Sequence, residues 1–274
     1  MALSNLQQRT ISGLIGAALM ISLIVINAYT FLFLSTALAL ASLHEFNHLI
    51  STKTDARPNK FMAMLISFFA IQISFLVEIG ILSNKYYFLS VPLIATIFTA
   101  ELYRKSAHPF QNIAFTVLSL VFTIIPFLFF LKIAFFAHAQ YSWRIVLGLF
   151  CILWASDIGA YISGKSFGRH KLFPSVSPGK TWEGALGGAL FSIAAAFLIG
   201  SYWKDLSLLQ WLGTSVIIVV FGMYGDLVES GLKRSIQIKD SGTMIPGHGG
   251  FLDRFDGLYL SLPIIYSYLQ FFIK

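Results

Sequence analysis

The chain has 274 residues, of which 57% are hydrophobic and only 11% are charged, whereas soluble domains carry roughly 25% charged residues. This composition excludes an ordinary soluble globular enzyme. The single cysteine, Cys151, excludes an internal disulfide framework and a multi-cysteine zinc site. The net charge of +7 indicates no nucleic-acid partner, because the basic residues lie between apolar runs and not on one face of a folded domain.

Long apolar runs predict nine membrane-spanning helices, since about 20 apolar residues cross roughly 30 Å of hydrocarbon. The runs cover residues 11–27, 28–43, 61–82, 86–102, 113–135, 144–163, 184–203, 208–225 and 256–273. We therefore expect an all-α, polytopic integral membrane protein. Residues 1–274 should form a single membrane domain, in which residues 1–143 are mostly scaffold and residues 144–274 carry the catalytic spans and loops.

The distribution of Lys and Arg predicts the orientation in the membrane. When alternate connections are assigned to alternate sides, most basic residues fall on the side of the N-terminus, which is cytoplasmic by the positive-inside rule. The two longest polar connections, residues 164–183 and 226–255, lie on the same side. We therefore expect the active site to face the cytoplasm.

The second run is followed by His44-Glu45-Phe46-Asn47-His48, which matches the zinc-binding pattern H-E-x-x-H. In that pattern the two histidines bind zinc and the glutamate acts as general base. An intramembrane zinc metalloprotease, with Asp256 as a further ligand, is therefore one alternative. It leaves residues 226–254 unexplained, and the other interpretation is a pair of interfacial histidines.

The sixth run contains an acidic side chain, Asp157, with Tyr161 one turn later on the same face. A carboxylate within a membrane segment is costly, so it usually faces a cavity, a partner or a bound ion. A carboxylate at a helix end or in a structural hydrogen bond is the simpler interpretation. A membrane transporter also buries carboxylates and is the second functional alternative.

The seventh helix is expected to open near Ser177, Lys180 and Thr181. Backbone N–H groups at a helix start, together with a lysine, suit a phosphate group. An ordinary helix start with an interfacial lysine explains the same residues. The two interpretations stay open at this point.

The densest polar stretch joins the last two runs. If the eighth helix continues past residue 225, Asp226, Glu229, Ser230 and Lys233 share one face. Two further carboxylates, three residues apart, begin the ninth helix after a basic, glycine-rich loop. Magnesium prefers oxygen ligands and is commonly held by carboxylates and substrate phosphates. A merely solvated loop would explain this mixture of charges poorly.

The C-terminal half resembles the phosphatidate cytidylyltransferases, also called CDP-diacylglycerol synthases. The residues that carry the resemblance in the last polar stretch are Ser230, Lys233, Arg234, Lys239, Asp240, His248, Gly249, Gly250, Asp253, Arg254 and Asp256. Upstream, two shorter elements are also similar to the family, namely Ser156, Asp157, Gly159, Ala160 and Tyr161, and Ser177, Pro178, Gly179, Lys180, Thr181, Glu183 and Gly184.

The resemblance implies an enzyme that converts CTP and phosphatidate to CDP-diacylglycerol and pyrophosphate. It also implies a magnesium requirement, with a second cation left open, and a homodimer in contact with membrane lipid. The family's metal ligands fall on Asp226 and Asp253. Phosphate contacts are expected from Lys180, Lys233, Arg234, Lys239 and Arg254. A short chain of this kind fits a bacterial inner membrane.

The remaining residues of the resemblance complete the expected site. The catalytic set is expected to include Asp240, His248 and Asp256 beside the metal ligands and the basic residues. The expected substrate-binding set is Ser156, Asp157, Tyr161, Ser177, Lys180, Thr181, Glu183, Glu229, Ser230, Gly249 and Gly250.

Overall fold

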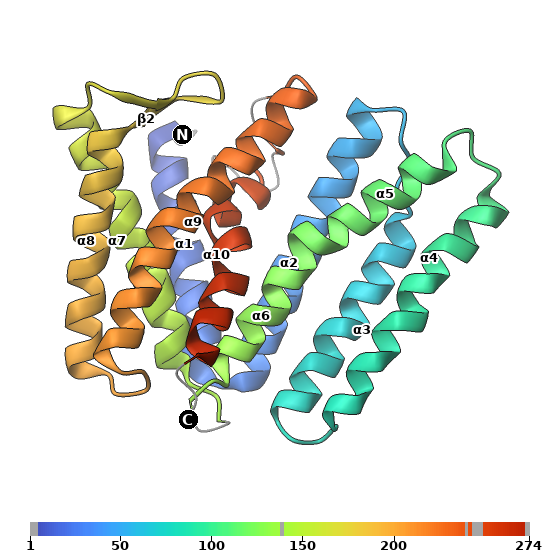
Figure 1. Ribbon diagram of the computed structural model, residues 1–274, viewed down its shortest axis with the longest axis horizontal. Coiled ribbons are helices and arrows are strands. Elements are labelled where there is room, and N and C mark those ends of the chain that lie inside the picture. The colour runs from blue at the N-terminus through green and yellow to red at the C-terminus, as the bar shows by residue number, and fades with distance from the viewer. Residues whose placement is uncertain (1–4, 138–139, 239–240, 243–248, 272–274) are drawn as a thin grey trace. The chain divides into compact units, whose positions relative to one another are not determined.

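A computed structural model describes residues 5–137, 140–238, 241–242 and 249–271. Almost all of this chain is helical, and Figure 1 shows the order of the elements. The only strands within the described residues form a small hairpin. Seven helical segments of the described chain are long and apolar enough to cross a membrane. The expectation of an all-α, polytopic membrane protein is therefore confirmed.

The helical elements follow the predicted apolar runs in chain order. They are α1 (Asn5–Ile26), α2 (Ala28–Lys53), α3 (Lys60–Glu78), η1 (Asn84–Leu89), α4 (Ser90–Arg104), α5 (Pro109–Ser119), η2 (Leu120–Ile124), α6 (Ile125–Ala134), α7 (Trp143–Phe167), α8 (Trp182–Tyr202), α9 (Leu208–Ser235) and α10 (Leu252–Gln270). The first and last predicted runs coincide with α1 and α10, which are not among the seven segments. Nine spans and a cytoplasmic N-terminus therefore stay predictions.

The chain divides into two compact units. Unit 1 comprises Met1–Phe135 and Asp240–Arg254, and unit 2 comprises Phe136–Lys239 and Phe255–Lys274. The boundary after Phe135 lies near the predicted division between residues 143 and 144. That residues 1–143 are mostly scaffold and residues 144–274 carry the catalytic spans and loops stays a prediction.

Unit 1 contains the first six α-helices. The side chain of Asn27 caps α2 by accepting hydrogen bonds from the N–H groups of Tyr29 and Thr30, as short polar residues do at helix starts. Helices α3 and α4 lie side by side (Figure 1). Pro126, which lacks an N–H group, follows the wide π-turn η2 between α5 and α6, so the predicted run 113–135 is one helical segment with an irregular turn.

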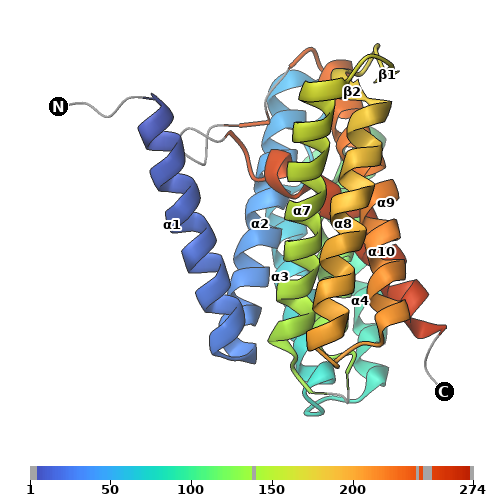
Figure 2. The same ribbon diagram turned by 90° about the vertical axis from the view of Figure 1, so that its left-hand side faces the viewer.

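Unit 2 contains α7, α8, α9 and most of α10. Figure 2 shows α7 and α8 side by side, with the hairpin at one end of the pair. Small residues allow this approach, because a Cβ on Gly159 would lie 2.6 Å from the carbonyl oxygen of Gly187. The hairpin strands β1 (Lys171–Phe173) and β2 (Ser177–Thr181) are antiparallel. They connect α7 to α8.

Candidate functional site

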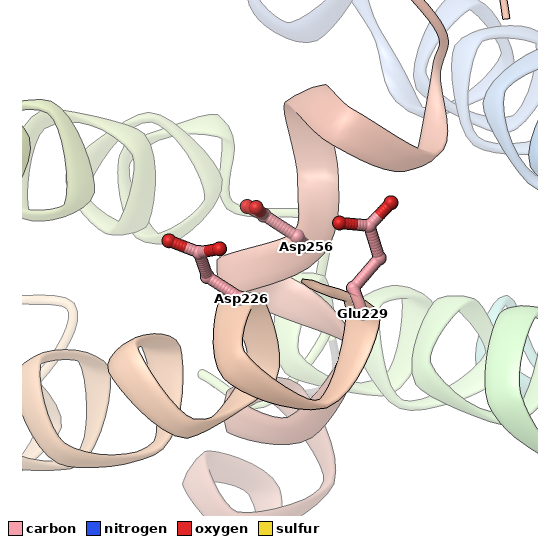
Figure 3. A group of neighbouring side chains, drawn as sticks. All are labelled: Asp226, Glu229 and Asp256. Carbon is pink, nitrogen blue, oxygen red and sulfur yellow. The ribbon is translucent and has the colours of Figure 1, made fainter. Parts of the chain in front are cut away.

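Three carboxylates from two helices of unit 2 converge on one point. Asp226 and Glu229 extend from α9 and Asp256 extends from α10, as Figure 3 shows. One oxygen from each side chain lies within 4.8 Å of the others. Helix α9 continues to Ser235, so the prediction that Asp226 and Glu229 share a face of the extended helix is confirmed.

The close crossing of α9 and α10 explains why these carboxylates can meet. A Cβ on Gly225 would collide with the carbonyl oxygen of Asp256. One turn earlier in α9, a Cβ on Gly222 would lie 3.4 Å from the carbonyl oxygen of Gly257. Glycine at these positions removes the side chain that would keep the two backbones apart.

Basic and polar groups partly balance the negative charges. Glu229 is only 1% exposed, and its Oε2 pairs with Nζ of Lys233 at 2.7 Å. Asp226 forms an ion pair with Lys180 and accepts a hydrogen bond of 3.1 Å from the Ser230 hydroxyl. Clustered carboxylates repel one another and are costly to bury unless cations compensate them.

This donor set fits a magnesium ion. All three groups offer carboxylate oxygens, which are the ligands that hard divalent cations prefer. Their positions on two helix segments also hold the oxygens close together without a flexible loop. Residues of this type at a membrane helix crossing are expected to mark a functional site.

The hairpin positions Lys180 beside this cluster. Glu183, at the start of α8, accepts hydrogen bonds from the N–H groups of Arg169 and His170 at 3.1 and 3.2 Å. Its Oε1 also lies 2.6 Å from Nδ1 of His170. Thr181 caps α8, since its hydroxyl oxygen accepts the N–H of Gly184 at 3.1 Å. Glu183 and Thr181 therefore close the hairpin at its base.

The other predicted residues of unit 2 lie around the same elements. Ser156 is in α7 against α8, where a Cβ on Gly188 would lie 3.2 Å from the Ser156 hydroxyl. Asp157 and Tyr161 are exposed on α7, and the negative charge of Asp157 is close enough to disfavour ionisation of Asp256. Ser177 begins β2 opposite Phe173.

Arg234 is the last predicted residue of unit 2 that the structure describes. It lies exposed near the end of α9 and donates a hydrogen bond of 3.0 Å to the carbonyl oxygen of Ile238. This places a basic side chain at the same end of α9 as Lys233.

The predicted glycine-rich turn belongs to unit 1. Gly249 has a φ of 88°, a left-handed conformation that glycine adopts without strain. Oδ2 of Asp253 accepts the N–H groups of Ser241 at 3.1 Å and of Gly250 at 3.3 Å. Arg254 is exposed beside it. Lys239, Asp240 and His248 lie outside the described residues.

The structure does not favour a zinc site in the H-E-x-x-H pattern. His44 and His48 are exposed on α2, with their rings stacked at 6.2 Å, whereas Glu45 is buried. In the part of the chain that the structure describes, the only group of three converging metal-ligand side chains is Asp226, Glu229 and Asp256.

The structure thus groups Asp226 with two carboxylates, Glu229 and Asp256, that the sequence had not assigned to the magnesium site. The three-residue spacing in α9 was the available signal for Glu229, and no local signal pointed to the approach of Asp256. The assignment of Asp253 to the metal stays a prediction. The sequence pattern predicted only a role in zinc binding for Glu45, whereas its side chain accepts the N–H of Leu252 at the start of α10.

Comparison with known proteins identifies the family. A family model described as "Cytidylyltransferase family" matches residues 7–272. The phosphatidate cytidylyltransferase of Staphylococcus haemolyticus is 31% identical over 270 residues, which cover 94% of this chain and 96% of that protein. The Bacillus subtilis protein of the same name is 31% identical over 271 residues, covering 98% and 99%. The protein of that name in Staphylococcus epidermidis is 43% identical over 163 residues, covering 59% and 60%.

The family match spans both units and includes the helices that carry the three carboxylates. Two relatives also align over nearly the full length of the chain. The chain therefore belongs to the cytidylyltransferase family.

Proposed function

We propose that this protein transfers the cytidylyl group of CTP to phosphatidate and releases pyrophosphate. An oxygen of the phosphatidate phosphate bonds to the α-phosphorus of CTP, and the bond from that phosphorus to the bridging oxygen of the β-phosphate breaks. The products are CDP-diacylglycerol and pyrophosphate. Family membership and the two nearly full-length relatives support this nucleotidyltransferase activity.

The carboxylate cluster is the structural observation that carries the proposal. Asp226, Glu229 and Asp256 would hold magnesium. Asp253 is a further proposed ligand, which rests on the family resemblance. When bound there, magnesium would neutralise charge on the CTP phosphates and on the departing pyrophosphate. A second cation is an open part of this proposal.

The lysines near the cluster are proposed to attract the substrate phosphates. Lys180 and Lys233 each pair with one of the carboxylates, so they can also attract the negatively charged phosphates of both substrates. The phosphatidate phosphate is already an anion at neutral pH. Positioning and charge neutralisation therefore matter more than removal of a proton by a general base.

The remaining sequence motif supplies further proposed contacts. Arg234, Lys239 and Arg254 would bind phosphate oxygens, and Gly249 and Gly250 would bring backbone N–H groups to an anion. His248 and Asp240 complete the proposed catalytic set.

The location of the reaction follows from its two substrates. Phosphatidate must keep its acyl chains in the bilayer while CTP arrives from water, so the reacting phosphates should meet at the headgroup level. We place this site on the cytoplasmic side of a bacterial inner membrane, and we propose a homodimer as the assembly. Accessibility labelling that places the 169–180 hairpin outside the cell would contradict this orientation.

The experiment that tests the proposed activity follows cytidine-labelled CTP into the lipid-extractable phase. Detergent-purified protein is incubated with phosphatidate and either magnesium or a chelator. Magnesium-dependent labelling of the lipid is expected. Absence of lipid labelling in folded protein, together with bound zinc or with transport across sealed vesicles, would favour the metalloprotease or the transporter instead.

A further inference from the structure

A buried carboxylate of the N-terminal half reaches the start of the last helix. Glu45 lies in α2 and is 3% exposed. Its Oε2 accepts the backbone N–H of Leu252 at 2.8 Å, across 207 positions of sequence. Leu252 is the first residue of α10. Glu45, Leu252 and the turn before it all belong to unit 1.

This hydrogen bond gives the N–H of Leu252 an acceptor that α10 itself does not provide. The first N–H groups of a helix have no partner within the helix, and negative charge is favourable there because the helix dipole is positive at this end. The buried carboxylate of Glu45 therefore acts as a cap for α10 that is supplied by a distant helix. The surrounding protein excludes water as a ready substitute for this acceptor.

Two glycines that precede α10, Gly242 and Gly250, lie against the same carboxylate. A Cβ on either Gly242 or Gly250 would collide with Oε1 of Glu45. A Cβ on Gly250 would also collide with the hydroxyl oxygen of Ser241, which is buried at the same place. The absence of a side chain at both positions leaves room for the carboxylate of Glu45.

The carboxylate of Asp253 braces this turn as well. Its Oδ2 accepts the N–H groups of Ser241 and Gly250, and both of these residues also lie close to Glu45. A shift of Ser241 or Gly250 would therefore change the direction of the Asp253 side chain. The carboxylate of Glu45 and that of Asp253 hold one structural element together.

We propose that Glu45 is a positioning residue, which fixes the start of α10 and thereby the orientation of the Asp253 side chain. This inference rests on the proposed function for the role of Asp253. It gives the glutamate of the H-E-x-x-H pattern a structural role that requires neither histidine nor zinc. It also gives α2, which was expected to be scaffold, a role in positioning a proposed metal ligand.

The test compares Glu45→Ala and Glu45→Gln with a matched control, Glu101→Gln. Glu101 is also 3% exposed and lies in unit 1, where it pairs with Arg104 and accepts a hydrogen bond from Asn112. Replacing it disturbs a buried carboxylate network elsewhere in the same unit. The control therefore separates the specific effect of Glu45 from a general loss of stability.

The first measurement is hydrogen exchange of the peptide that covers residues 249–254, in protein without metal or substrate. Faster exchange is expected in Glu45→Ala, a smaller increase in Glu45→Gln, and wild-type exchange in Glu101→Gln. The smaller effect of Gln follows because its amide oxygen can still accept the Leu252 N–H. If Glu45→Ala does not fold, Glu45→Gln decides the outcome alone.

The second measurement is the magnesium concentration that gives half-maximal transfer. Loss of a group that orients a metal ligand typically costs about 10- to 100-fold in metal affinity or activity, so Glu45→Ala should raise this concentration by about that factor. Folded Glu45 variants with wild-type exchange and a wild-type magnesium requirement would overturn the inference. Absence of transfer in the wild type would refute the proposed function instead, and the exchange result would still decide whether Glu45 holds the turn.

Discussion

The carbonyl oxygen of Asp256 would collide with a Cβ on Gly225. The obstacle is backbone, so it cannot move aside as the end of a flexible side chain could. Gly225→Ala should therefore push α10 away from α9, separate the carboxylates and abolish most of the transfer activity. Overpacking of this kind costs about 1–3 kcal/mol of stability, which thermal unfolding in detergent would detect.

Gly231→Ala is the matched control for this substitution. Gly231 lies in the same helix, and a Cβ there would meet nothing within 4 Å. Because alanine favours a helix over glycine by up to about 1 kcal/mol, this variant should be at least as stable as the wild type and fully active. Equal activities of the two variants would show that the close crossing does not matter.

The ion pair between Lys180 and Asp226 predicts a role for the hairpin lysine in transfer. Lys180→Gln should lower kcat/KM by about 100-fold, similar to the loss of one charge-stabilising group in other active sites, and Lys180→Arg should restore part of it. Lys171→Gln changes an exposed lysine of the same hairpin and should have little effect. If both Gln variants lose activity equally, the effect comes from overall charge.

Glu183 should control how firmly the hairpin is held. Its carboxylate accepts backbone N–H groups from Arg169 and His170, so Glu183→Ala leaves them without this acceptor. Faster tryptic cleavage after Arg169 and Lys171 is expected, together with lower transfer activity because Lys180 is less well placed. Asp205→Asn, which alters an unrelated contact to Ser142 in unit 2, should leave the cleavage rate unchanged.

The exposed histidines of α2 should be dispensable. His44→Ala and His48→Ala remove side chains on the surface of the helix, and neither should change lipid labelling or its magnesium dependence. A zinc-selective chelator should also have no effect on the wild type. Loss of lipid labelling in both variants and in chelator-treated wild type would show instead that the two histidines bind a functional zinc ion.

Local patterns in the sequence predicted most of the helices, because apolar runs long enough to span a membrane have few other stable conformations. The spacing of Asp226 and Glu229 also predicted their common face. The hairpin was not predicted, since Pro178 and Gly179 are unfavourable in strands. Its closure depends on Glu183, which lies beyond both strands.

Contacts between distant segments could not be predicted from local patterns. The approach of Asp256 to Asp226 depends on the crossing at Gly225, and the role of Glu45 depends on Leu252, 207 positions away. A pentapeptide that matches a zinc motif has the same letters whether its glutamate faces a metal or caps another helix. Only the burial of Glu45 and its partner distinguish these cases.

The most direct test of the central claim is the magnesium dependence of label transfer from CTP to phosphatidate in wild type and Asp226→Asn. Asp226 pairs with Lys180 and belongs to the carboxylate cluster, so the variant should lose at least about 100-fold in transfer while its thermal unfolding stays close to that of the wild type. Near wild-type transfer by Asp226→Asn at limiting magnesium would contradict the account.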